Sequence, residues 1–255
     1  MRVRNISDPF LTALFYIEYV LFSVAFIVLA AVITTASGLL HSRRSALRLT
    51  RCFIRWYGVL ICALAYPRVR VQVKNPAHVP ADEPCLFISN HQSIADIFLM
   101  ARLPKRECVF ISNRWPFRIP VLGLIARLAG YLSIQTTKPA QLFDQAAKLL
   151  SDRVSIISFP EGTRTRTGAL GHFHTTVFKL ALHCKVPIIP ICIAGNRQIM
   201  PPGCWTIHPG TARMHILPAI SPESYEGITP HQLKRKAREL MARELASMEG
   251  TIACN

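Results

Sequence analysis

The sequence predicts an α/β protein with a mixed, largely parallel sheet flanked by helices, behind an N-terminal membrane-associated helical part. Short runs of strand-forming residues alternate with helix-length segments, which is the pattern of parallel and mixed sheets. Two of these runs end in polar turns, where open α/β sheets bind their ligands. An apolar segment near the N-terminus is long enough to cross a bilayer.

From Phe10 to Leu40 the chain carries one acidic or basic residue, Glu18. The segment is longer than the roughly 20 residues of a membrane-spanning helix and longer than the apolar core of a signal peptide. We expect an uncleaved anchor that spans the bilayer or lies partly in one leaflet. Arginines are more numerous after it than before it, so the positive-inside rule predicts that the main domain faces the cytoplasm.

Arginines and large apolar residues alternate at near-helical spacing in residues 43 to 65. This pattern predicts a basic amphipathic helix that lies on anionic headgroups. The alternative is an ordinary helix that packs on the domain with its arginines solvated. The arginines concerned are Arg43, Arg44, Arg48, Arg51 and Arg55.

The elements that follow are predicted from their periodicity and from the residues that interrupt it. Residues 69–73 alternate as a half-buried strand does, and Asn75-Pro76 ends that strand. The expected strands are 69–73, 85–89, 107–111, 131–134, 154–159, 186–193 and 212–217. The expected helices are one that ends near residue 102, an apolar helix around 121–126 within the segment 116–130, and 140–150, 175–184 and 232–248.

No internal repeat, low-complexity tract or linker divides residues 66 to 255. We therefore predict two parts: residues 1–65, with the anchor and the basic helix, and residues 66–255, which form one domain. The eight cysteines are scattered without a C-x-x-C pair, which predicts reduced thiols of a cytosolic compartment. His172 and His174 lack a Cys or carboxylate at ligand spacing, so we predict no metal site.

The stretch Asn90-His91-Gln92-Ser93-Ile94-Ala95-Asp96 follows the strand at 85–89. A neutral imidazole can take a proton from a hydroxyl near neutral pH, and a carboxylate on its other ring nitrogen would fix the tautomer. His91 and Asp96 fit these two roles. Alternatively, Ser93 and Asp96 form a capping box that satisfies free amides at a helix start. This stretch alone leaves both interpretations open.

A second polar turn closes the strand at 154–159 and reads Phe159-Pro160-Glu161-Gly162-Thr163-Arg164-Thr165-Arg166-Thr167-Gly168. Arginine forks, threonine hydroxyls and the amides beside glycines all suit a phosphate group. The alternative is a basic turn that is merely solvated.

Together the two stretches resemble the glycerolipid acyltransferase family, of the lysophosphatidate acyltransferase (1-acylglycerol-3-phosphate O-acyltransferase) type. The first is similar to the N-H-x-x-x-x-D block of that family, and the second is similar to its F-P-E-G-T-R block. Val186-Pro187-Ile188-Ile189-Pro190 is similar to a V-P-I-x-P strand, and residues 118–130 resemble an intervening block in their prolines and glycines. The resemblance covers residues 50 to 220 and implies a glycerolipid acyltransferase-like fold.

The resemblance implies an enzyme of phospholipid biosynthesis. It would transfer a fatty acyl group from acyl-CoA or acyl carrier protein to the free hydroxyl of a lysophospholipid, with 1-acylglycerol 3-phosphate as acceptor and phosphatidate as product. His91 would be the general base and Asp96 its orienting partner. No cofactor is implied, because the thioester is already activated. The implied substrate-binding residues are Phe159, Pro160, Glu161, Gly162, Thr163 and Arg164.

The sequence departs from the family where phosphate contacts are implied. Ser112-Asn113-Arg114 stands where members often have a lysine, and Gln135-Thr136-Thr137 stands where they have an arginine. Phe173-His174-Thr175-Thr176 replaces a usual Lys and Gly. Lyso-ornithine lipid and glycerol 3-phosphate are therefore alternative acceptors. The candidates for a second positive contact are Arg114, Lys138 and Arg166.

The composition bears on the class of partner. Hydrophobic residues make up 51% of the chain, and 30 Lys and Arg against 14 Asp and Glu give a net charge of +16. A basic nucleic-acid-binding protein is thus an alternative of a different class, but the arginines cluster beside the anchor and no nucleic-acid motif occurs. A serine hydrolase is disfavoured because G-x-S-x-G is absent from the sequence. We expect membrane lipids, a lysophospholipid and an acyl thioester as partners, and no nucleic acid.

Overall fold

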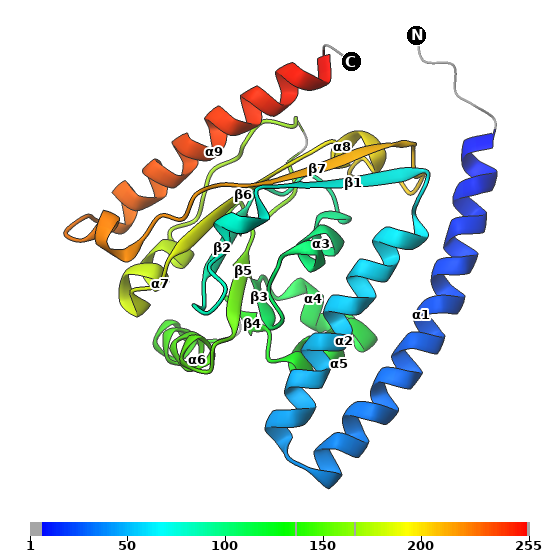
Figure 1. The fold of residues 1–255 in the computed structure, drawn as a ribbon, viewed down its shortest axis with the longest axis horizontal. Helices are drawn as coiled ribbons and strands as arrows, with labels where there is room; N and C mark the ends of the chain where they lie inside the picture. Colours follow the sequence, from blue (N-terminus) through cyan, green and yellow to red (C-terminus); the bar gives the residue numbers. More distant parts are fainter. Residues whose placement is uncertain (1–6, 136, 166, 254–255) are drawn as a thin grey trace.

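A seven-stranded sheet forms the centre of the computed structural model, which describes residues 7–135, 137–165 and 167–253 (Figure 1). The strands lie in the order β1-β7-β6-β2-β5-β3-β4. Neighbours are parallel except β6 and β7, so the predicted mixed, largely parallel sheet is confirmed. The bounds are β1 Val69–Lys74, β2 Leu86–Ser89, β3 Cys108–Ser112, β4 Leu132–Ser133, β5 Ser155–Ser158, β6 Ile188–Ala194 and β7 Gly210–Ile216.

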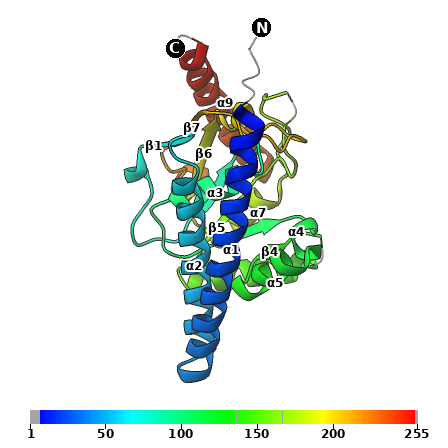
Figure 2. The same ribbon diagram turned by 90° about the vertical axis from the view of Figure 1, so that its right-hand side faces the viewer.

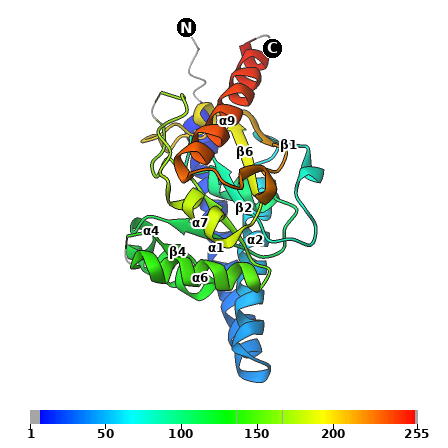
Figure 3. The ribbon, with the colours of Figure 1, turned by 90° about the vertical axis from the view of Figure 1, so that its left-hand side faces the viewer.

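Helices cover both faces of the sheet, and each face buries its own hydrophobic core. On one face lie α6 (Pro139–Ser151), α7 (Thr176–Cys184) and α9 (Pro230–Ala253), which Figure 3 shows from their side. On the other face lie α1 (Ser7–Leu40), α2 (Arg43–Leu64) and α3 (Asp96–Leu99). The shorter helices are α4 Trp115–Arg118, α5 Pro120–Ala129 and α8 Asn196–Ile199, with 3-10 turns η1 Pro76–His78, η2 Met100–Arg102 and η3 Pro222–Tyr225.

Two helical segments are less regular in the structure than a single helix would be. The helix expected to end near residue 102 is one α-helical turn, α3, continued by the 3-10 turn η2. The segment 116–130, expected to contain a helix around 121–126, forms two helices, α4 and α5, because Ile119 has extended backbone angles and a proline follows it at the start of α5. A residue before proline disfavours the helical conformation, so a helix restarts there.

Helix α1 is long and apolar enough to cross a membrane, and its large apolar side chains are mostly exposed, as Leu21 and Val32 show. It lies beside α2 as an antiparallel hairpin, which Figures 1 and 2 show in dark and light blue. Aromatic rings fill the contact, and the ring of Phe22 stacks on that of Tyr57. The hairpin therefore forms one unit that shields part of the sheet.

The contacts made by the arginines of α2 match neither interpretation made from the sequence. Arg44 pairs with Asp152 at 2.8 Å, and Arg48 pairs with Glu107 at 3.3 Å. Arg51 is buried and donates to Glu107 at 3.0 Å and to the carbonyl oxygen of Ala129 at 2.9 Å. The basic residues of α2 are thus neither all solvated nor all free for lipid headgroups, because carboxylates of the domain bind three of them.

Candidate active site

The two polar stretches meet at the carboxyl ends of β2 and β5, which are parallel neighbours. His91 follows β2, and Phe159 directly follows β5. The imidazole of His91 stacks on the ring of Phe159, with centroids 4.2 Å apart and planes 16° from parallel. Both segments are placed by buried strands, so the meeting point is fixed by the core of the protein.

The carboxylate of Asp96 is fully buried and accepts four hydrogen bonds. Oδ2 lies 2.8 Å from Nδ1 of His91 and accepts from the amides of Gln92 at 2.6 Å and Ser93 at 2.9 Å. Oδ1 accepts from Nδ2 of Asn196 at 2.7 Å. An ionised carboxylate is an acceptor only, so Nδ1 of His91 carries the proton that it shares with Asp96. Nε2 of the neutral ring is then free to accept a proton.

The structure favours the His–Asp pair over the capping box. Asp96 contacts the ring of His91 and accepts from the amides of Gln92 and Ser93. The N-cap of α3 is Ala95, and no side chain makes a capping hydrogen bond there. The Ser93 hydroxyl donates to the carbonyl oxygen of Met200 at 2.8 Å. The two amides of the turn therefore orient the Asp96 carboxylate toward His91.

The second stretch holds the backbone of His91 on both sides. Oε1 of Glu161 accepts from the His91 amide at 3.0 Å, and the Thr165 amide donates to the His91 carbonyl oxygen at 2.8 Å. Oε2 of Glu161 accepts from the amide of Gly171 at 2.9 Å. Burial raises the pKa of Glu161, and the two amide hydrogen bonds oppose part of that rise.

Gly171 allows this arrangement because it has no side chain. A Cβ at this position would lie 2.5 Å from Oε2 of Glu161. Any larger residue would have to displace the carboxylate that holds His91. This role could not be predicted from the sequence, because Gly171 lies outside both polar stretches.

A large apolar cavity of about 1740 Å³ opens beside the His91 ring, between the α1–α2 hairpin and the sheet. Its walls are mainly aromatic and aliphatic, with Phe26, Phe53 and Tyr57 from the hairpin. The predicted substrate-binding residues that line it are Phe159, Pro160, Gly162, Thr163 and Arg164, whereas Glu161 is not part of the lining.

Arg164 is exposed at this lining and has no hydrogen bond or ion pair with any other residue that the structure describes. The side-chain amides of Asn113 and Gln135, in contrast to Arg164, are engaged in hydrogen bonds with the backbone. Nδ2 of Asn113 donates to the carbonyl oxygen of Gly162 at 2.8 Å, and Oε1 of Gln135 accepts from the Arg114 amide at 3.2 Å. Arg166, a candidate second contact, lies outside the described residues.

Asn196 belongs to the site through its hydrogen bond to Asp96, but the sequence analysis did not predict it. It is buried at the start of α8, directly after β6, and β6 is the other parallel neighbour of β2. Its position after a strand that resembles a family block was a usable signal, because polar residues at the ends of adjacent parallel strands converge.

Known proteins that resemble this chain in sequence or in fold are acyltransferases. Residues 70–194 match the family model described as Acyltransferase, a segment that contains both stretches. The chain is 34% identical to the "1-acyl-sn-glycerol-3-phosphate acyltransferase BAT2, chloroplastic" of Brassica napus, over 54% of this chain and 41% of the relative. It is 32% identical to the 1-acyl-sn-glycerol-3-phosphate acyltransferase alpha of Mus musculus, over 64% of this chain and 58% of the relative.

The chain is thus similar to the acyltransferase family through residues 70–194. It spans about half the length of the curated relatives just named. The crystal structure of the 1-acyl-sn-glycerophosphate (LPA) acyltransferase PlsC from Thermotoga maritima has the same fold, with a TM-score of 0.80 over 97% of this chain and 98% of that chain. The sequence identity to that structure is 23%.

Proposed function

We propose that the protein transfers a fatty acyl group from an acyl thioester to the free hydroxyl of a lysophospholipid. The acceptor proposed is 1-acylglycerol 3-phosphate and the product is phosphatidate. The single observation that carries this proposal is the buried Asp96 on Nδ1 of His91 beside the large apolar cavity. An acyl chain fits such a cavity, and a hydroxyl is the group that the imidazole can deprotonate.

The proposed reaction needs no covalent enzyme intermediate. The acceptor oxygen attacks the thioester carbonyl while its proton passes to Nε2 of His91. The C–S bond then breaks, an ester C–O bond remains, and the thiolate leaving group takes the proton from the imidazolium and departs as the thiol. Asp96 stabilises the imidazolium between these two steps. Acyl-CoA and acyl carrier protein both supply a thioester for this reaction.

We propose further that α1 associates with a membrane and that the domain lies on its cytoplasmic side. The exposed apolar side chains of α1 and the arginines that follow it support this arrangement. The apolar cavity touches the same hairpin, so a lipid acceptor can reach His91 without crossing much water.

The acceptor is tested with purified protein in detergent, a radiolabelled acyl-CoA and a panel of acceptors. The panel contains 1-acylglycerol 3-phosphate, lyso-ornithine lipid, glycerol 3-phosphate and lysophosphatidylcholine. We expect labelled phosphatidate as the main product. Transfer to another acceptor alone would overturn the acceptor, and absence of transfer from both acyl-CoA and acyl carrier protein would overturn the reaction.

Arg164 is proposed to bind the phosphate of the acceptor. Its guanidinium can form a bidentate contact that an ammonium cannot reproduce. Arg164→Lys and Arg164→Ala should therefore raise the KM of the acceptor far more than the KM of the donor. Arg70→Gln, an exposed change on β1 away from the cavity, is the matched control. A defect confined to the donor would assign this turn to the donor.

A further inference from the structure

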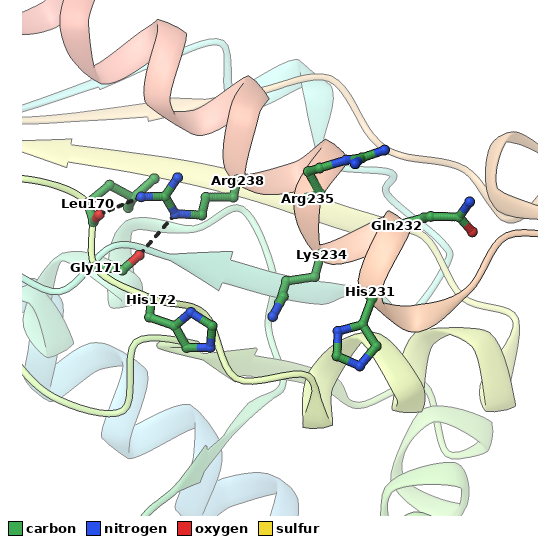
Figure 4. A pocket seen from close by; sticks show the side chains of 8 residues that line it. All are labelled: Leu170, Gly171, His172, His231, Gln232, Lys234, Arg235 and Arg238. Carbon is green, nitrogen blue, oxygen red and sulfur yellow. Dashed lines mark hydrogen bonds between the residues drawn. The ribbon is translucent and has the colours of Figure 1, made fainter.

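A second hollow, of about 570 Å³, lies between α9 and the loop that follows the second stretch (Figure 4). Gly171 and His172 of the loop form one wall. Lys234 extends from α9 into the space between the rings of His172 and His231, and Arg235 and Arg238 lie along the same helix. This cleft is separate from the apolar cavity, and the volume is that of a small-molecule site.

The cleft is strongly basic. Three fixed positive charges line it, from Lys234, Arg235 and Arg238, and no acidic residue is among the described residues that form its walls. Arg235 meets a carboxylate, Glu239, only at 3.9 Å on the exposed side of α9. Like charges gathered in this way repel one another, and the repulsion is relieved when an anion binds between them.

Arg238 is already held in place. Its Nε donates to the carbonyl oxygen of Gly171 at 3.1 Å and its NH2 donates to that of Leu170 at 2.9 Å. Both acceptors are uncharged, so the positive charge of the guanidinium is not neutralised by them. A fixed guanidinium loses less rotational freedom when it binds an anion than a mobile one does.

The cleft is also connected to His91. The Gly171 amide, in its wall, and the His91 amide are bound by the two oxygens of the same Glu161 carboxylate. A ligand in the cleft would therefore contact the loop that shares the Glu161 carboxylate with the backbone of His91.

We propose that this cleft binds a phosphorylated anion. Lysine and arginine are the usual partners of phosphate, and the two imidazole rings offer flat surfaces for a base. Two sources have this chemistry: the phosphorylated nucleotide end of CoA, and free inorganic phosphate. The first source rests on the proposed function, since it requires a CoA thioester as donor.

The test is equilibrium binding to the full chain in detergent micelles by calorimetry, which needs no acyl transfer. One arm uses adenosine 3′,5′-bisphosphate, the phosphorylated part of CoA without the thiol arm, and the other uses inorganic phosphate. We expect saturable binding that Lys234→Gln with Arg235→Gln weakens at least tenfold. His91→Ala should leave the binding unchanged, which separates this site from the proposed reaction.

Lys236→Gln is the matched control, because Lys236 is an exposed lysine of the same helix outside the cleft, bonded to the carbonyl oxygen of Ser224. Tighter binding of the nucleotide than of phosphate would assign the cleft to CoA. Equal binding of the two would assign it to free phosphate. Absence of saturable binding, or equal affinity of the double variant and the wild type, would overturn the proposal.

Discussion

At the scale of single residues, His91 is fixed through its ring and through its backbone. Asp96 contacts its Nδ1, and Glu161 and Thr165 bind its amide and carbonyl. A general base must be held within hydrogen-bond reach of its proton, and a loop residue is rarely so constrained without help. The second stretch thus has two roles: Arg164 lines the cavity, and Glu161 holds the backbone of the first stretch.

Glu161 gives a pH-dependent prediction. Its folded pKa is raised above the ordinary value of 4.5 by burial. The stability that it contributes is therefore fully present below pH 4.5 and is lost as the pH rises through the raised folded value. Relative to Glu161→Gln, the wild type should lose free energy of unfolding as the pH rises from 4.5 towards neutrality. Denaturant unfolding of both proteins across this range measures the difference in free energy of unfolding. A wild type that gains stability relative to Glu161→Gln as the pH rises would contradict the prediction.

Asn196 is expected to be a positioning residue. Asn196→Ala removes the donor to Oδ1 of Asp96, and an unsatisfied buried acceptor costs about 1–3 kcal/mol of stability. With Asp96 less well held, kcat should fall while the acceptor KM stays near the wild-type value. Steady-state kinetics decide this, with Gln198→Ala on the exposed side of the same short helix as control. Equal kcat in both variants would remove Asn196 from the site.

The sequence located the pair and the second stretch, because each motif follows a strand and is local in the chain. The long-range contacts of the site could not be predicted from the sequence. Glu161 with His91 and Asn196 with Asp96 join residues 70 and 100 positions apart, and both depend on β5 and β6 flanking β2. Strand order is set by tertiary packing, which a periodic pattern does not contain.

At the scale of elements, α2 is both a partner of α1 and a part of the domain. Its apolar side meets α1 and η2, while Arg48 and Arg51 reach Glu107, which directly precedes β3. The basic pattern of this helix therefore has a structural cause besides attraction to anionic lipid. Residual vesicle binding after deletion of α1 should be weaker than five free arginines would give.

The two carboxylates that bind α2 should contribute very differently. Glu107→Gln leaves the buried guanidinium of Arg51 without its counter-charge and should cost up to about 3 kcal/mol. Asp152→Asn breaks an exposed pair with Arg44 and should cost less than about 1 kcal/mol. Denaturant unfolding of the two variants in detergent compares them. A similar loss in both would mean that Arg51 is solvated and that α2 is not docked as described.

Most elements were predictable because their apolar periodicity is strong. The strands at 69–73, 107–111 and 212–217 lie within two residues of the prediction. The reversal between β6 and β7 was not predictable, since each strand has the same local pattern in either direction. The helix expected around 121–126 lies within α5, which begins at a proline.

At the scale of the whole molecule, apolar and basic surfaces are separated. Exposed apolar side chains gather on α1, next to the large cavity, whereas the basic cleft lies at α9. A lipid acceptor and an acyl chain are thus expected on the hairpin side and a water-soluble anion on the other. The boundary between residues 1–65 and 66–255 stays a prediction, although the docking of α2 indicates that the two parts are packed together.

The central claim is that His91, oriented by Asp96, accepts the proton of the acceptor hydroxyl. The most direct measurement is the rate of acyl transfer to 1-acylglycerol 3-phosphate by His91→Ala, with His183→Ala, an exposed histidine of α7, as control. Circular dichroism and thermal unfolding establish that both variants are folded. We expect His91→Ala to lose about 10² to 10⁴ in kcat and the control to lose none. Near-normal turnover by a folded His91→Ala variant would contradict the account.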